Sequence, residues 1–157
     1  MQPPAPAPVA PPEVTDIDLT GWEEAINNGL ADGTPCLLAT ADDRGYPDIA
    51  FKGSMMVFDK DHLAWWERSL AEQIAQVEQN PHIVVLYRNP AKHQIPHMRL
   101  YGDATLYRSG EMREKVMSRT VQRELDSDPE RKGFAVVVQV NRVRVGRNTV
   151  QERNGTS

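Results

Sequence analysis

Residues 48–81 read DIAFKGSMMVFDKDHLAWWERSLAEQIAQVEQNP, and this stretch decides the fold. Short apolar runs on either side of the polar residues 59–62 predict strands joined by a hairpin turn. Ser69 and Glu72 then form an S-x-x-E capping box, and apolar residues recur at helical spacing until Asn80 and Pro81 end the helix. A helix that begins at a strand end points free backbone N–H groups at that end. The stretch therefore predicts a cofactor cleft suited to a phosphate.

The length and composition of the chain predict one globular domain. With 157 residues, 39% hydrophobic and 25% charged, the chain can build a single core but not two ordinary domains. The formal net charge of −4 argues against a nucleic-acid or membrane-surface partner, because both favour a basic protein face. No apolar run approaches the ~20 residues that span a bilayer. Cys36 is the only cysteine and lies in an apolar run, and there is no signal-peptide pattern, so we expect a cytoplasmic protein with an inert thiol.

The sequence divides into three segments. Residues 1–17 are rich in Pro and Ala and predict a disordered tail, with a proline-recognition segment as the alternative. Residues 18–147 form the domain, which opens with a helix whose Thr20 and Glu23 make a second capping box. Residues 148–157 are polar and predict a flexible C-terminal tail.

Strand patterns dominate the domain. Six or seven strands are expected in the segments 35–40, 46–51, 55–58, 63–66, 82–87, 98–107 and 133–145. Three helices are expected between them, near residues 20–30, 69–79 and 112–125. Short turns between successive strands favour an antiparallel barrel or sandwich over a parallel βαβ sheet, so the fold class is mainly β with added helices.

The order of these motifs resembles a known family. The motifs are LLAT at 37–40, D-x-R-G-x-P at 42–47, KGS at 52–54, FDKDHLAWW at 58–66, IVVLY at 83–87 and RLYGDATL at 99–106. Over residues 30–145 this order is similar to the pyridoxamine-phosphate-oxidase-like split barrels, and more closely to their small FMN-binding bacterial branch. The resemblance implies a six-stranded antiparallel split barrel that forms a homodimer, with flavin mononucleotide (FMN) in clefts at the subunit interface. It also implies an FMN-dependent oxidoreductase that acts on a small molecule.

The resemblance places the cofactor-binding residues on two segments. They are Lys52, Gly53, Ser54, Trp66, Arg68, Ser69 and Gln73, with Arg99 as a further candidate. Many family members carry Lys or Arg on the first helical turn, where this chain has Glu72 and Gln73. Lys52 and Arg68 would then have to neutralise the phosphate. A deazaflavin, a haem or an empty cleft therefore stay open as alternatives, and with them a non-catalytic binding module.

The remaining aromatic and histidine residues predict packing more than chemistry. Trp65 and Trp66 face opposite sides of one strand, so one can fill the barrel and the other can line a cleft, where it could stack on a flavin. His93 and His97 are four residues apart, but Pro96 between them disfavours the helix that a metal pair would need, and we expect no metal site. No acid or base stands out, which fits a reaction whose redox chemistry belongs to a cofactor.

Overall fold

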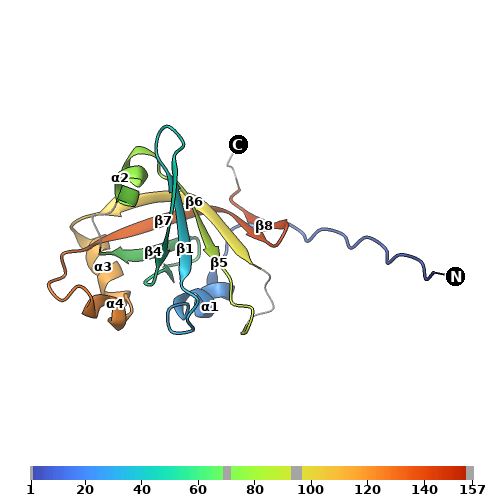
Figure 1. Ribbon diagram of the computed structural model, residues 1–157, viewed down its shortest axis with the longest axis horizontal. Helices are drawn as coiled ribbons and strands as arrows, with labels where there is room; N and C mark the ends of the chain where they lie inside the picture. Colours follow the sequence, from blue (N-terminus) through green and yellow to red (C-terminus); the bar gives the residue numbers. More distant parts are fainter. Residues whose placement is uncertain (1, 69–71, 93–96, 155–157) are drawn as a thin grey trace.

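A computed structural model describes residues 2–68, 72–92 and 97–154 of the chain. Antiparallel strands form one sheet that curls into a half-barrel, with short helices around it (Figure 1). The strands are β1 (Cys36–Ala41), β2 (Pro47–Lys52), β3 (Met56–Val57), β4 (His62–Glu67), β5 (His82–Tyr87), β6 (Met98–Tyr107), β7 (Phe134–Val145) and β8 (Asn148–Glu152). The helices are the 3₁₀ turn η1 (Thr20–Trp22), α1 (Glu23–Asn27), α2 (Glu72–Gln79), α3 (Glu111–Arg119) and α4 (Gln122–Asp126).

The sheet order is β2-β1-β5-β6-β7-β4-β3, and β8 also pairs with β7. Every pairing between these strands is antiparallel. The prediction of a mainly β, antiparallel split barrel with helices is therefore confirmed. Six strands, β2 to β4 in this order, make its body. The two-residue β3 extends one edge, and β8 forms a hairpin with β7.

The barrel core follows from period-two alternation along the strands. In β6, Met98 and Leu100 point into the core, while Arg99 and Tyr101 lie on the other face. Gly102 follows a β-bulge, and a Cβ built on it would lie 2.2 Å from the carbonyl oxygen of Gln139, so only glycine fits there.

Strand β7 is buried on both faces over its first half because two different layers cover it. Val136 and Val138 belong to the barrel core, and Ala135 and Val137 pack with Val116 of α3. This double cover explains why residues 134–138 are continuously apolar instead of alternating.

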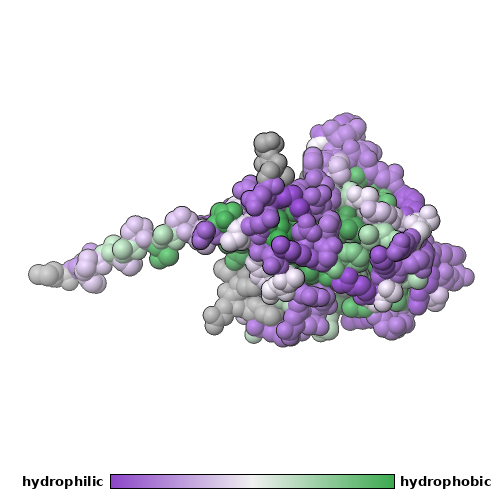
Figure 2. Space-filling view, turned by 180° about the vertical axis from the view of Figure 1, so that it is seen from behind, coloured by the Kyte–Doolittle hydropathy of each residue, from purple (hydrophilic) through white to green (hydrophobic). Residues whose placement is uncertain are grey.

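Both ends of the domain differ from their prediction. Residues 148–152, expected in a flexible tail, form β8, and Thr15 makes an isolated parallel bridge to Gln151. Ile17, placed in the N-terminal tail by sequence, is buried in the core. Residues 2–14 extend away from the body (Figures 1 and 2). Backbone pairing with a neighbouring strand, which composition does not reveal, orders both segments.

Two helices also differ from their prediction. Thr20 is not the cap of the first helical segment: the N-cap residue is Leu19, which makes no side-chain cap hydrogen bond, and the Thr20 hydroxyl instead donates to the Asp18 carboxylate. The helix expected near 112–125 is divided into α3 and α4 at Thr120, whose backbone is extended. The Ser69–Glu72 capping box includes residue 69, which lies outside the described residues; α2 itself ends at Gln79, as predicted. None of the described helices is long and apolar enough to cross a membrane.

Candidate functional site

A cleft of about 410 Å³ opens where the end of β2 meets the end of β4 and helix α4. Its lining residues are Asp48, Ala50, Phe51, Lys52, Gly53, Ser54, Trp66, Glu67, Arg68, Gln73, Glu124 and Ser127. Six of the eight residues expected to bind a cofactor belong to this set: Lys52, Gly53, Ser54, Trp66, Arg68 and Gln73. The structure thus brings together the two segments that the sequence singled out.

Lys52 is held by a buried carboxylate. Its Nζ lies 2.9 Å from Oε2 of Glu67, and the indole Nε1 of Trp65 donates to the same oxygen at 2.9 Å. The side chains of Lys52 and Glu67 are only 11% and 3% exposed. An anionic ligand would therefore have to share this ammonium group with an internal partner.

Arg68 is held by a second carboxylate. Its Nε lies 2.9 Å from Oε2 of Glu124 on α4, with side chains 41% and 12% exposed. The other carboxylate oxygen, Oε1, lies 2.5 Å from the place where a Cβ on Gly53 would be, so the carboxylate packs against the glycine backbone. Three lining carboxylates, those of Asp48, Glu67 and Glu124, thus face two lining cations.

Ser54 and Gln73 are fixed by the backbone of neighbouring strands. The Ser54 hydroxyl donates to the carbonyl oxygen of Trp66 at 3.1 Å and accepts from its N–H at 2.9 Å. The side-chain amide of Gln73, 1% exposed, donates to the carbonyl oxygen of Leu38 at 3.1 Å. Its Oε1 is buried and has no hydrogen-bond partner among the described residues. A buried acceptor of this kind on the wall of a cleft is suited to a donor on a ligand.

Trp65 and Trp66 face opposite sides of β4, as the sequence predicts. Trp65 belongs to the barrel core. The Trp66 ring is buried on the other side, where its Nε1 donates to Oδ2 of Asp128 at 2.9 Å and the guanidinium carbon of Arg113 lies 4.9 Å from the ring centre. The Trp66 ring is therefore covered by its own chain and does not offer an open face for stacking.

Asp128 fixes the segment that carries α4. Besides the Trp66 indole, it accepts the backbone N–H of Gly133 and of Lys132, each at 2.9 Å. Burial acts to raise the Asp128 pKa, but the hydrogen bonds from Gly133, Trp66 and Lys132 outweigh it, and the pKa lies below its ordinary value of 3.8. The sequence indicates a turn at Asp128 but not its partners, which lie up to 62 residues away.

Arg99 and Ser69 are the two candidates not found in the cleft. Arg99 lies in a separate hollow with Leu86, Arg88 and His97. Ser69 lies outside the described residues, as does His93 of the histidine pair considered above.

The face of the sheet that carries Arg99 also exposes a row of apolar side chains at the β2 edge. Ile49 and Phe51 point outward from β2 and are 61% and 66% exposed. They lie opposite Ala39 and Leu37 of β1 in the strand register. Ile49 and Phe51 thus form a small exposed apolar surface, and Phe51 also lines the cleft.

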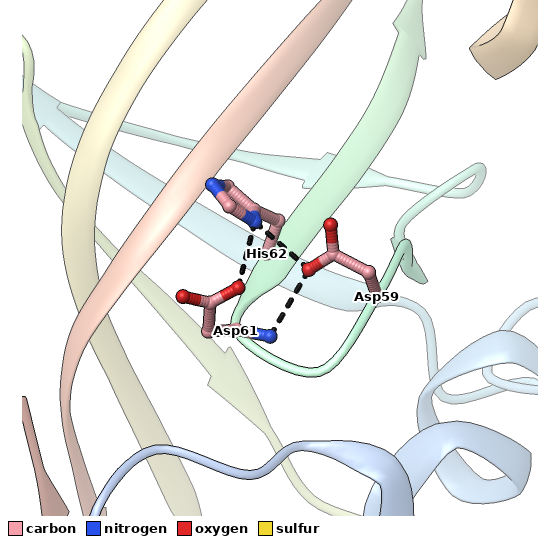
Figure 3. Close-up of side chains that lie close together, drawn as sticks. All are labelled: Asp59, Asp61 and His62. Carbon is pink, nitrogen blue, oxygen red and sulfur yellow. Dashed lines mark hydrogen bonds and ion pairs between the residues drawn. The ribbon is translucent and has the colours of Figure 1, made fainter.

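One group of potential metal ligands occurs among the described residues, at the β3–β4 hairpin (Figure 3). His62 Nδ1 lies 2.8 Å from Oδ1 of Asp59 and 3.0 Å from Oδ1 of Asp61. The N–H of Asp61 binds the Asp59 carboxylate, and Arg153 pairs with Asp61 at 2.9 Å. These contacts account for the group as a turn stabilised by internal hydrogen bonds and by the ion pair between Arg153 and Asp61.

Comparison with known proteins places the chain in a family. The family model described as pyridoxamine 5'-phosphate oxidase matches residues 22–145, most of the chain. The protein belongs to this family of pyridoxamine 5'-phosphate oxidase-like split barrels. A search of curated proteins finds no match.

Several solved structures share the fold. HupZ from Group A Streptococcus is 18% identical, with a TM-score of 0.62, over 81% of this chain and 95% of that chain. The heme storage protein HutZ from Vibrio cholerae is 16% identical, with a TM-score of 0.60, over 79% and 94%. An FMN-binding protein from Syntrophomonas wolfei subsp. wolfei is 15% identical, with a TM-score of 0.57, over 79% and 85%. At these identities the likeness shows the fold alone.

The residues present fit FMN in their chemical types. The cleft offers two cations for a phosphate and an unpartnered buried acceptor for a ring N–H, while its glycine, Gly53, is contacted by the Glu124 carboxylate. The fit has one condition, because each cation already has a carboxylate partner at 2.9 Å.

Proposed function

We propose that the protein is an FMN-dependent oxidoreductase that binds flavin in the cleft at the end of β2, acts on a small molecule and works as a homodimer. The observation that carries this proposal is the unpartnered Gln73 Oε1, 1% exposed, on the wall of a 410 Å³ cleft that also holds Lys52 and Arg68. When bound, the flavin would supply the hydride chemistry.

The roles of the chain's own residues are binding and orientation. Lys52 and Arg68 would meet the phosphate, and Gln73 Oε1 would accept a hydrogen bond from the ring. Glu67 and the Trp65 indole hold the Lys52 ammonium in place, while the Ser54 hydroxyl ties the end of β4 to the turn after β2. We assign no catalytic acid or base to this chain.

The dimer is part of the proposal because the exposed apolar side chains adjoin the cleft. Phe51 lines the cleft and is also 66% exposed, so the cleft opens beside the apolar face. A second copy packed on this face would remove Ile49 and Phe51 from water and shield the cleft from solvent. Arg99, on the same face of the sheet, would then lie at or near the contact between copies.

We further propose a cytoplasmic location without a nucleic-acid or membrane partner. The net charge of −4 and the buried Cys36 thiol support it.

Flavin binding tests the proposal directly. The purified protein, or the protein after incubation with FMN and gel filtration, should absorb near ~370 and ~450 nm, as bound flavins do. The variant carrying both Lys52→Ala and Arg68→Ala should bind FMN at least about tenfold more weakly in a fluorescence titration, because it loses both phosphate partners. Lys132→Ala, which removes an exposed lysine outside the cleft, is the matched control. Equal FMN affinity in the wild type, the double variant and the control would refute the assignment of Lys52 and Arg68 to the phosphate.

A second candidate function is a non-catalytic module that binds a flavin, a deazaflavin or a haem. Two observations favour it. Both cations of the cleft already pair with a carboxylate, and a third carboxylate, that of Asp48, also lines the cleft, so the described residues of the cleft offer no unpaired positive charge for a phosphate. Anaerobic mixing of the FMN-loaded protein with a panel of hydride donors separates the two. Loss of the ~450 nm absorbance faster than with free FMN supports the enzyme. Retained binding without such loss, or a haem Soret band in the purified protein, supports the module.

A further inference from the structure

We propose that Glu124 determines the specificity of the cleft by occupying the place that the anionic group of a ligand would take. Its carboxylate then competes with a ligand phosphate for Arg68, and so reduces the affinity of the cleft for FMN relative to the same ring without a phosphate. This inference rests on the proposed function, since it concerns the same cleft.

The first argument is the position of the carboxylate. Oε2 of Glu124 lies 2.9 Å from Nε of Arg68, the distance of a charge-assisted hydrogen bond. Oε1 lies against Gly53, where a Cβ would be only 2.5 Å away. A glycine backbone and an arginine are the partners that a ligand phosphate would use, and here one protein carboxylate contacts both.

The second argument is that the fold holds Glu124 in this place. The next residue, Leu125, is buried, and its carbonyl oxygen accepts a hydrogen bond from Arg131. Asp128 ties the end of the same segment to the Trp66 indole and to the Gly133 N–H. The Glu124 side chain is only 12% exposed, so its position follows from an anchored helix and not from a free surface side chain.

The third argument is electrostatic. A phosphate that entered beside Arg68 would meet Glu124, and Glu67 and Asp48 line the same cleft. Like charges a few ångströms apart in a partly buried site repel, so the phosphate would have to displace Glu124 or share Arg68 with it. A ligand without a phosphate would face neither condition.

The experiment compares FMN with riboflavin, which carries the same ring without the phosphate. Affinities are measured by flavin fluorescence for the wild-type protein, for Glu124→Gln and Glu124→Ala, and for the matched control Glu130→Gln. Glu130 is a carboxylate of the same region that pairs with Lys132 outside the cleft. We expect the affinity for FMN relative to riboflavin to rise about tenfold or more in both Glu124 variants, and to stay at the wild-type value in the control.

A second measurement does not depend on flavin. Inorganic phosphate is titrated into the ¹⁵N-labelled proteins, and the amide shift of Gly53 is followed. The Glu124 variants should show a saturable shift at a phosphate concentration about tenfold or more below that needed by the wild-type protein and Glu130→Gln. The inference is overturned if the FMN-to-riboflavin ratio is the same with and without Glu124, or if phosphate shifts Gly53 equally in all proteins. If no protein binds either flavin, the proposed function fails, and the phosphate titration alone decides the role of Glu124.

Discussion

Replacing Asp128 by asparagine tests how the segment that carries α4 is held over the cleft. The Asp128 carboxylate accepts three N–H groups, two at Oδ2 from Trp66 and Gly133 and one at Oδ1 from Lys132, all at 2.9 Å. An asparagine has one acceptor oxygen. If this oxygen keeps the two bonds at the Oδ2 position, its NH₂ group must face the N–H of Lys132. One charge-assisted hydrogen bond is then lost and the others weaken.

The expected cost of Asp128→Asn is about 2–3 kcal/mol in the free energy of unfolding. In a domain of this size it corresponds to a fall in Tm of about 6–10 °C. Urea denaturation followed by tryptophan fluorescence measures it. Asp126→Asn is the matched control, since Asp126 is exposed and bonds only Gln122 among the described residues; it should change stability by no more than about 0.5 kcal/mol.

The same variant makes a prediction about pH. Because the folded state lowers the Asp128 pKa, the carboxylate adds stability that is fully present above its ordinary value of 3.8 and is lost as the pH falls through the folded value. The stability difference between wild type and Asp128→Asn should therefore be constant near neutral pH and shrink below about pH 4. A difference that is absent at pH 7, or that grows on acidification, would refute the reasoning.

Three further predictions follow from the cleft, the sheet face and the core. Lys52→Met should destabilise the protein by about 3 kcal/mol in urea, because it breaks the buried ion pair between Lys52 and Glu67. Lys52→Met combined with Glu67→Gln should recover part of the loss, and equal stability of wild type and Lys52→Met would contradict the contribution of this pair. Phe51→Glu should convert a dimer into a monomer, so the mass measured by light scattering should fall from twice the 17.7 kDa chain mass to 17.7 kDa. Its circular dichroism spectrum should stay unchanged. A wild-type protein that is already monomeric would exclude the interface. Cys36, whose pKa burial raises to about 12, should react with a thiol reagent only at the rate of unfolding, and fast labelling of the native protein would contradict its place in the core.

The fold could be predicted because its signals are local. Alternation and turn residues predict the strands and the antiparallel pairs β1–β2, β3–β4 and β5–β6, which are neighbours in sequence. The pairs β1–β5 and β4–β7 join strands that are distant in sequence, and no local pattern indicates them. Residues 52–54 and 66–68 meet in one cleft although β2 and β4 do not pair in the sheet. The hydroxyl of Ser54 bonds directly to the backbone of Trp66.

The parts that the sequence missed depend on contacts between distant segments. Glu124 reaches Arg68 across 56 residues, and Asp128 reaches Trp66 across 62. A helix pattern predicts neither partner. The break at Thr120, after which α4 lies beside the cleft, interrupts a stripe of apolar residues that is continuous in the sequence. Strand β8 was missed because its sequence is mostly polar and it is ordered mainly by pairing with β7, with Val150 alone packed against the core.

A crystal structure of the protein grown with FMN tests the central claim most directly. The account predicts two copies joined through the face that carries Ile49 and Phe51, each with a flavin in the cleft between Gln73 and Arg68. The Gln73 Oε1 should accept a ring N–H, and the Glu124 carboxylate should have moved from Arg68. A single unpaired copy, or flavin bound elsewhere while Glu124 keeps its place, would contradict the account.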